Sequence, residues 1–392
     1  MKVFQINTFG NKSTGRIATD LYRTLKENGH EGKVAFARNS IAEDVPHIKI
    51  GNTFNVYLDG ILTRITDKAG FYSKSATKKL IKEIKEYNPD IIHLHNLHGY
   101  YINVEILFKF LKDFDKPVVW TLHDCWAFTG HCCYYTMADC QKWQTGCSHC
   151  LQKNIYPTSL LRDNSKWNYE KKKELFTSLP KLRLVPVSDW LSEEVGKSFL
   201  KDIPRTVIKN GIDLSVFKPT ESDFREKCDL KDKFIILGVA SDWSPIKGLD
   251  DFVELSKQLD DSYKIVVVGV TAKQKKELPQ NIISILRTES LKELAGLYST
   301  ADVLFNPTKD DNFPTVNIES LACGTPVISY GAGGSAEAFD ETCGKEITHK
   351  DVLYTMEKLR DANFSKDMCV LRAEKYDSKT KYEEYIKLYE NL

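Results

Sequence analysis

The sequence predicts an α/β fold that contains two doubly wound parallel sheets. Two observations lead to this prediction: the length of 392 residues, and the regular alternation of short β-branched runs with longer segments of helical period. A chain of this length exceeds what one compact core usually holds, so we expect two domains. Hydrophobic residues make up 42 % and charged residues 28 %, which are ordinary globular values and exclude disordered and fibrous classes.

Each half of the chain carries its own series of expected strands. The first series covers residues 2–6, 33–36, 90–95, 117–121 and 182–187. The second series covers residues 234–239, 264–268, 283–286, 302–305 and 326–329. Helices are expected between the strands, for example at residues 250–259, 291–298 and 316–321.

The junction between the two domains is expected near residues 203–210, where a short apolar run leads into the turn Asn210-Gly211-Ile212-Asp213. The first domain then spans residues 1–205 and the second residues 206–378. The last helical stretch, residues 379–392, could pack on either domain, including back on the first.

Charge is divided unevenly along the chain. Residues 1–200 carry 28 Lys/Arg against 21 Asp/Glu, and the remainder carries 27 against 33. A basic first half suits an anionic membrane surface or a phosphate-bearing acceptor, and a solvated surface of uneven charge is the alternative. The first residues lack the apolar core of a signal peptide, and no stretch approaches the roughly 20 apolar residues that span a bilayer. We therefore expect a cytoplasmic protein whose ten cysteines are reduced.

The most informative segment is residues 306–328, NPTKDDNFPTVNIESLACGTPVI, which reads as strand, polar loop, helix, glycine turn and strand. Ligands of open α/β sheets bind at the carboxyl ends of the strands, where this loop lies. A helix that begins after Pro314 would direct its free amides at a phosphate or a sugar hydroxyl. Glu319, about one turn into that helix, could accept paired hydrogen bonds from a ribose diol, and Asp311 could accept from sugar hydroxyls.

This segment resembles the E-x7-E signature of retaining glycosyltransferases of family four, in the variant usually written EDNFP. Asp311 stands at the first acidic position and Glu319 at the second. The resemblance extends over nearly the whole chain. Residues 90–101 (DIIHLHNLHGYY) and 120–124 (WTLHD) are similar to the branch that assembles colanic acid and exopolysaccharides. The other matching segments are the small-residue turn expected at residues 11–16, residues 210–213, Lys247-Gly248, and Gly333-Gly334 with Glu337.

The resemblance implies the GT-B architecture, in which two Rossmann-like domains face each other across a cleft. The first domain would bind the acceptor and the second the nucleotide-sugar donor. The implied reaction moves a hexose, with retention, from a UDP- or GDP-sugar to a polyprenyl-linked or oligosaccharide acceptor at the inner face of the plasma membrane, without a catalytic metal ion. No nucleic-acid partner is expected. A nucleotide-sugar epimerase of GT-B architecture and a catalytically degenerate binding subunit are the alternatives.

Transfer from such a donor builds negative charge on the departing phosphate, so fixed positive groups are expected to stabilise it. Lys247 is the candidate. Related enzymes add an arginine at one of two nearby places, where this chain has Asp242 and Ile246. The phosphate is then expected to rely on Lys247, on amides of residues 312–316, or on Arg287 or Arg16.

Further site residues follow from the same resemblance. Asp310 could share the task of Asp311, which is shorter than the usual glutamate. His123, after the expected strand 117–121, would face the donor sugar. The remaining donor-binding candidates are Asn312, Phe313, Pro314, Thr315, Val316, Gly15 and Arg16. The acceptor-side candidates are His95, His98 and Tyr100, because the histidines cluster at another expected strand end, and a generic polar cluster is the alternative.

Five cysteines fall in the irregular stretch 128–157, with His131 and His149 nearby. Cys147 and Cys150 form a C-x-x-C pair, which Cys140 and either Cys132 or Cys133 could complete as a structural zinc site. The set taken here is Cys132, Cys140, Cys147 and Cys150. Unligated core thiols and a redox role are the alternatives.

Overall fold

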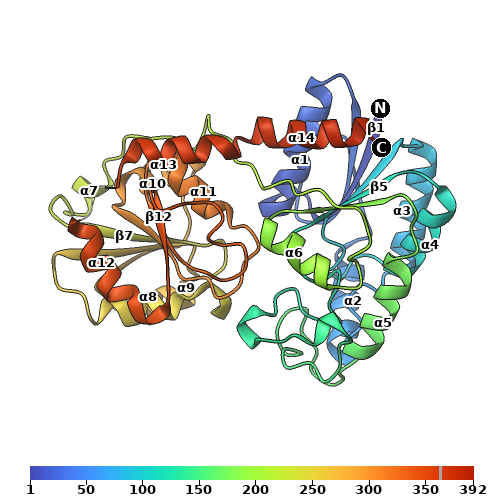
Figure 1. Ribbon diagram of the computed structural model, residues 1–392, viewed down its shortest axis with the longest axis horizontal. Coiled ribbons are helices and arrows are strands. Elements are labelled where there is room, and N and C mark those ends of the chain that lie inside the picture. The colour runs from blue at the N-terminus through green and yellow to red at the C-terminus, as the bar shows by residue number, and fades with distance from the viewer. Residues whose placement is uncertain (362–363) are drawn as a thin grey trace. The chain divides into compact units, whose positions relative to one another are not determined.

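The computed structural model describes residues 1–361 and 364–392, and it divides into two compact units (Figure 1). Unit 1 comprises Met1–Lys209 and Lys381–Leu392, and unit 2 comprises Asn210–Thr380. Each unit contains a six-stranded sheet in which the strands pair in parallel, with helices against both faces of the sheet. The prediction of an α/β chain with two doubly wound sheets is confirmed.

The sheet of unit 1 has the strand order β3-β2-β1-β4-β5-β6, so the order reverses between β1 and β4. Its strands are β1 (Lys2–Phe9), β2 (Glu31–Arg38), β3 (His47–Lys49), β4 (Ile91–Leu94), β5 (Val118–Leu122) and β6 (Leu182–Pro186). Its helices are α1 (Lys12–Glu27), α2 (Thr53–Thr66), α3 (Lys74–Tyr87), α4 (Val104–Phe114), α5 (Ser165–Phe176) and α6 (Asp189–Lys197).

The sheet of unit 2 repeats this plan with the order β12-β11-β10-β7-β8-β9, which reverses between β7 and β10. Its strands are β7 (Phe234–Val239), β8 (Tyr263–Val268), β9 (Ile282–Ile285), β10 (Val303–Asn306), β11 (Val327–Tyr330) and β12 (Gly344–Ile347). Its helices are α7 (Phe224–Lys227), α8 (Leu249–Ser256), α9 (Ala272–Glu277), α10 (Leu291–Thr300), α11 (Thr315–Ala322), α12 (Val352–Asp361) and α13 (Lys366–Ala373).

All ten expected strands are present, with bounds that differ by no more than three residues. The two further strands, β3 and β12, are short and lie at the edges of their sheets. Both are partly exposed and carry charged residues, so neither produces the apolar run by which a buried parallel strand is recognised. One expectation was wrong: residues 11–16 do not form a turn, because α1 begins at Lys12 and Gly15 packs within its first turn.

Helix α14 (Ser378–Glu390) begins in unit 2 and packs into the core of unit 1. The helix runs beside α1 (Figure 1), and its buried side chains form one hydrophobic cluster with Ile17 and Leu21. Polar contacts add to this packing, since the hydroxyl of Tyr385 lies 3.0 Å from Oγ1 of Thr121 on β5. The described parts of the chain contain no helix that is both long enough and apolar enough to cross a membrane.

Candidate functional site

In unit 2, the polar loop 307–314 joins β10 to α11 beside the point where the strand order reverses. Ligands bind at such points because the crossover connections on either side diverge and leave the strand ends accessible. Two backbone hydrogen bonds hold the loop: the amide of Lys309 donates to the carbonyl of Ile246 at 2.8 Å, and the amide of Gly334 donates to the carbonyl of Asp311 at 3.0 Å. The loop is therefore fastened to the segments that follow β7 and β11.

Two glycines permit this close approach. Gly333 has a φ of +63°, and a Cβ at this position would lie 2.1 Å from the carbonyl oxygen of Asp311. Gly248 has a φ of +75°, and a Cβ there would lie 2.5 Å from the carbonyl oxygen of Pro307. Left-handed backbone and the lack of space both require glycine at these positions.

Glu319 lies on α11 and is only 7 % exposed. The hydroxyl of Tyr298, on α10, donates to its Oε2 atom at 2.9 Å. Burial and the neighbouring carboxylate raise the pKa of Tyr298, so the hydroxyl keeps its proton and stays a donor. Asn317 fixes the helix by contacting Asn306 on β10 and the carbonyl of Ser335. The carboxylate is thus held in a defined place at the start of α11.

The structure brings Lys247 and Asp311 together as an ion pair. Lys247 ends the short 3-10 helix η3 (Pro245–Lys247) that follows β7, and its side chain is about one-third exposed. Asp310, which was expected to share the task of Asp311, is 1 % exposed. Asp311 is therefore the carboxylate that contacts Lys247.

The remaining donor-side candidates differ in exposure. Asn312, Phe313 and Pro314 are buried, whereas Thr315 and Val316 at the start of α11 are partly exposed. Pro314 is the N-cap of α11 and makes no side-chain capping bond, so it does not occupy the amides of the first turn. In the other parts of the chain, Arg287 and Arg16 are exposed, and Gly15 is buried in unit 1.

In unit 1, histidines gather at the carboxyl ends of the adjacent strands β4 and β5. Nδ1 of His95 lies 3.2 Å from Nε2 of His123, and Nε2 of His95 lies 3.0 Å from Oε1 of Gln5. Burial lowers the pKa of His95 well below its usual value and that of His123 to about 4, so both rings are neutral near pH 7. His95 is 0 % exposed and positions His123, which is the more accessible of the two.

A second hydrogen-bond network is centred on His98. Its Nε2 lies 2.6 Å from Oδ2 of Asp124, and its Nδ1 lies 2.9 Å from the hydroxyl of Tyr156. Burial alone would raise the pKa of Asp124, but His98 and the hydrogen bond from the amide of Trp126 outweigh it and leave the carboxyl acidic. The sulfur of Cys133 also lies within 4.8 Å of the His98 and Asp124 ligand atoms. Because both nitrogens of His98 are engaged, this group is a hydrogen-bonded unit that fixes Tyr156.

A cavity of about 580 Å³ in unit 1 lies where β2 and β3 end against α2. Three basic residues, Arg38, Lys49 and Arg64, line it together with Tyr57 and Tyr100. Of these, only Tyr100 was expected from the sequence. The others come from three separate elements, one of which is the strand β3 that the sequence did not predict.

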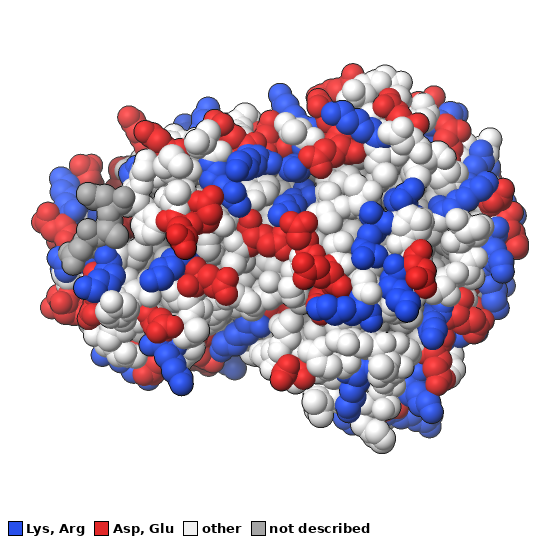
Figure 2. Space-filling view, in the orientation of Figure 1, with Lys and Arg blue, Asp and Glu red and all other residues white. Residues whose placement is uncertain are grey.

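Next to this basic cavity, α2 exposes an apolar face. The exposed residues follow helical spacing, so they form one stripe: Phe54, Tyr57, Leu58, Ile61 and Ile65. The stripe continues onto Leu160, which is 62 % exposed and whose amide donates to the carbonyl of Arg64 at 2.7 Å. In contrast, the face of the molecule drawn in Figure 2 shows basic and acidic side chains interspersed, with no area of one sign dominating it.

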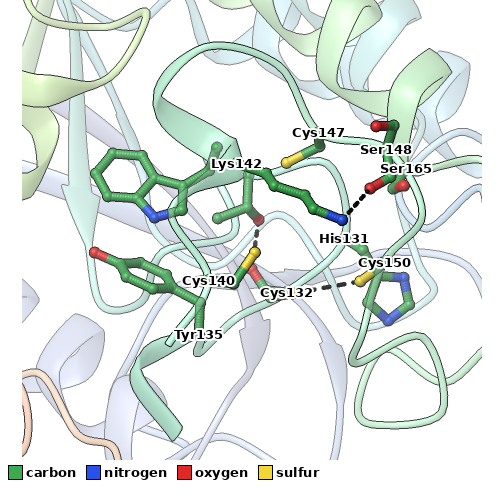
Figure 3. Close-up of a pocket in the computed structure, with 11 residues that line it drawn as sticks. His131, Cys132, Tyr135, Cys140, Lys142, Cys147, Ser148, Cys150 and Ser165 are labelled. Carbon is green, nitrogen blue, oxygen red and sulfur yellow. Dashed lines mark hydrogen bonds between the residues drawn. The ribbon is translucent and has the colours of Figure 1, made fainter. Parts of the chain in front are cut away.

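The four cysteines chosen from the sequence line one small cavity in the segment that connects β5 to α5 (Figure 3). Cys133 is not among them, because it is 2 % exposed and lies with His98 and Asp124. The sequence left the choice between Cys132 and Cys133 open, and the structure places Cys132 at the cavity.

Two units, each with a six-stranded parallel sheet and the unit 2 sheet with a polar loop at its reversal point, form the architecture that glycosyltransferases of the GT-B type have. Comparison with protein-family models agrees with this class: residues 14–216 match "Glycosyltransferase Family 4" and residues 220–347 match "Glycosyl transferases group 1". The first match alone covers more than half of the chain. The chain therefore belongs to glycosyltransferase family 4, and the family expected from the sequence is confirmed.

Two named proteins are similar to this chain in sequence, over different lengths. The colanic acid biosynthesis glycosyl transferase WcaC, so named in Escherichia coli (strain K12), is 26 % identical over 320 residues, which cover 78 % of this chain and 77 % of the relative. A D-inositol 3-phosphate glycosyltransferase from Stackebrandtia nassauensis is 28 % identical over 153 residues, 34 % of either chain.

Solved structures share the fold. Sucrose-phosphate synthase from Thermosynechococcus elongatus superposes with a TM-score of 0.73 at 15 % identity, covering 100 % of this chain and 98 % of that one. Anabaena Alr3699/HepE in complex with UDP superposes with a TM-score of 0.69 at 15 % identity, covering all of both chains.

Proposed function

We propose that the protein transfers a hexose, with retention of anomeric configuration, from a UDP- or GDP-sugar to a glycan acceptor in the assembly of a bacterial surface polysaccharide. One observation carries the proposal: Lys247, Asp311 and Glu319 gather around the β10–α11 loop at the reversal point of the unit 2 sheet. The name of WcaC supports the polysaccharide role, and the HepE structures with UDP and UDP-glucose support a nucleotide-sugar donor.

Unit 2 binds the donor in this proposal. Glu319 accepts hydrogen bonds from the ribose hydroxyls, and the first amides of α11 receive the diphosphate. Lys247 exchanges its partner, because the diphosphate is a stronger anion than a single carboxylate. Asp311 is then released to accept a hydrogen bond from a hydroxyl of the sugar. Together with Asn312, Phe313 and Pro314, these residues form the donor site.

The chemistry is a front-face substitution. The acceptor oxygen bonds to the anomeric carbon while the bond from that carbon to the phosphate oxygen breaks on the same face, and the acceptor proton passes to the departing oxygen. Lys247 and the α11 amides stabilise the charge that develops on the diphosphate, so no metal ion is needed. His123 is neutral and contributes a hydrogen bond to a sugar hydroxyl.

Unit 1 binds the acceptor, which we propose is linked to a polyprenyl diphosphate. Its basic cavity matches a diphosphate, since Arg38, Lys49 and Arg64 all line it. The apolar stripe of α2 beside it matches a hydrocarbon chain. Such an acceptor places the enzyme at the inner face of the plasma membrane, as a peripheral protein of the cytoplasm. His98 and Tyr100 lie on the acceptor side.

The test is an assay of the purified full chain with a panel of nucleotide sugars, with and without polyprenyl-diphosphate-linked acceptors. We expect release of the nucleoside diphosphate only when donor and acceptor are both present, and NMR of the product should show the anomeric configuration of the donor. Glu319→Gln should remove turnover while circular dichroism stays unchanged, and the exposed Glu341→Gln serves as its control.

Two other results would contradict the proposal. Conversion of the donor sugar without an acceptor would identify an epimerase. Binding of a donor without turnover under any condition would identify a binding subunit.

A further inference from the structure

We propose that Cys132, Cys140, Cys147 and Cys150 bind one structural zinc ion. The four residues line a cavity of about 20 Å³ within the segment that connects β5 to α5. In Figure 3 the sulfur atoms of Cys140, Cys147 and Cys150 all point towards the interior of this cavity. All four side chains are partly buried free thiols, and none forms a disulfide.

The spacing of one pair fits zinc. Zinc holds four thiolates tetrahedrally at about 2.3 Å, which places neighbouring sulfurs about 3.8 Å apart. The sulfurs of Cys132 and Cys150 lie 3.7 Å apart, which matches one edge of such a tetrahedron. Among the described residues, no third sulfur lies within 4.8 Å of both. Cys140 and Cys147 stand on irregular backbone, so zinc binding would draw their side chains inwards.

The surroundings of the sulfurs suit a metal site. The amide of Gly130 donates to Sγ of Cys147 at 3.1 Å, as amides around metal-bound thiolates do. The ammonium group of Lys142 donates to the carbonyls of Ser148 and His149, both at 3.1 Å, and places a positive charge beside the thiols. His149 has a φ of +49°, which closes the tight turn between Cys147 and Cys150.

His131, the histidine that lines the cavity, is already engaged. The ring of His131 contacts a carboxylate oxygen of Asp67 through Nδ1 and lies 3.2 Å from the carbonyl of Ile155 through Nε2. The ligand set is therefore four sulfurs, which favours zinc or an iron–sulfur cluster. A cavity of about 20 Å³ has room for about one water-sized body, which favours a single ion over a cluster.

This site would order a functional segment. Residues 123–164 connect β5 to α5, and the described secondary structure within them consists of two short 3-10 helices, η1 (Thr136–Ala138) and η2 (Lys142–Gln144). Stretches of this length without regular structure need another source of order, and a metal site supplies folding free energy directly. The same segment carries Asp124 and Tyr156, which hold His98, so the ion would position the acceptor side of unit 1 without contacting a substrate.

The experiment measures metal in the full chain, purified under reducing conditions without chelators. We expect one zinc per chain by mass spectrometry of the metal, and X-ray absorption of the unmodified protein should show four sulfur neighbours at about 2.3 Å. Cys147→Ser and Cys150→Ser should each lower the zinc content severalfold. Cys228→Ser changes a partly buried thiol in unit 2, outside the cavity, and should retain full zinc.

Several results would overturn the proposal. One is a zinc content well below one ion per chain that added zinc does not restore. Another is iron with inorganic sulfide in place of zinc, and a third is oxygen or nitrogen neighbours of the zinc in the absorption spectrum. Undiminished zinc in Cys147→Ser would do the same. Because a cysteine variant could fail to fold, the absorption spectrum of the unmodified protein decides the matter independently.

Discussion

Lys247 and Asp311 form an ion pair across 64 positions of the chain, and this pair joins the turn after β7 to the loop before α11. Both residues belong to the proposed donor site. An empty site thus keeps its cation neutralised, and a bound diphosphate has to compete with the carboxylate for Lys247. Variants of the two partners should therefore behave in opposite ways towards the nucleotide.

Asp311→Asn preserves the size of the side chain and removes its charge. We expect tighter binding of the nucleoside diphosphate by several-fold, since Lys247 is no longer neutralised, together with a fall in kcat of about 10- to 100-fold from the lost sugar contact. Calorimetry of nucleotide binding and steady-state kinetics measure the two effects. The exposed Asp232→Asn is the control, and weaker nucleotide binding in Asp311→Asn would contradict the proposed exchange of partners.

Lys247→Ala removes the fixed positive charge near the departing phosphate. We expect kcat to fall by about 100- to 1000-fold, the usual cost of losing one group that stabilises developing charge. The exposed Lys257→Ala, at the end of α8, should retain the original rate. Equal rates in the two variants would show that Lys247 is not in the active site.

Gly333→Ala tests the contact between the β11 turn and the donor loop. A methyl group there would collide with the carbonyl of Asp311, whereas Gly324 has a similar positive φ and its nearest neighbour would lie at 3.4 Å. Both variants should lose about 1 kcal/mol of unfolding free energy from the left-handed backbone, and Gly333→Ala should lose more and lose donor binding as well. Chemical denaturation measures the unfolding free energy of the two variants, and a thermal-shift assay measures their donor binding. Equal losses in both variants would contradict the close contact between Gly333 and the carbonyl of Asp311.

The buried histidines of unit 1 predict acid sensitivity. Burial lowers the pKa of His93 to about 3 and that of His123 to about 4, whereas unfolded histidines titrate near pH 6.5. Between about pH 6.5 and pH 4 the unfolded chain binds more protons, so the free energy of unfolding falls as the pH falls, by up to about 1.4 kcal/mol per pH unit for each histidine. Urea denaturation at a series of pH values measures this slope. His93→Gln should reduce the slope of the unfolding free energy against pH by the contribution of about one proton. The variant of the exposed His47, His47→Gln, should leave this slope closer to that of the original protein.

Ile386→Ala tests the contribution of α14 to unit 1. Ile386 is 4 % exposed in the cluster that α14 forms with α1, so its truncation should cost about 2–4 kcal/mol of unfolding free energy. The neighbouring Lys387 is exposed, and Lys387→Ala should change stability by less than about 0.5 kcal/mol. Hydrogen exchange can compare the two units, and a loss of amide protection in unit 2 alone would contradict the assignment of this helix to unit 1.

Much of the fold could be predicted because parallel strands are buried on both faces and therefore leave apolar runs in the sequence. The placement of Asp311 in a loop and of Glu319 on the helix that follows could also be predicted, since one loop and one helix turn determine their spacing. The partner of Lys247 could not be predicted, because a contact across 64 positions depends on how the turn after β7 is directed. The basic cavity was missed for a similar reason: Arg38 and Lys49 meet only once β3 pairs with β2.

The path of the chain also has a consequence for synthesis. Unit 1 is translated first as far as Lys209, but α14, which completes its hydrophobic core, follows only after all of unit 2 has been made. At ordinary elongation rates the gap lasts roughly ten to thirty seconds. During that time the nascent first unit presents the uncovered side of α1, including Ile17 and Leu21, to the ribosome surface and to chaperones. Unit 2, being continuous in sequence, is free of this delay and can reach its native state before the unit that precedes it.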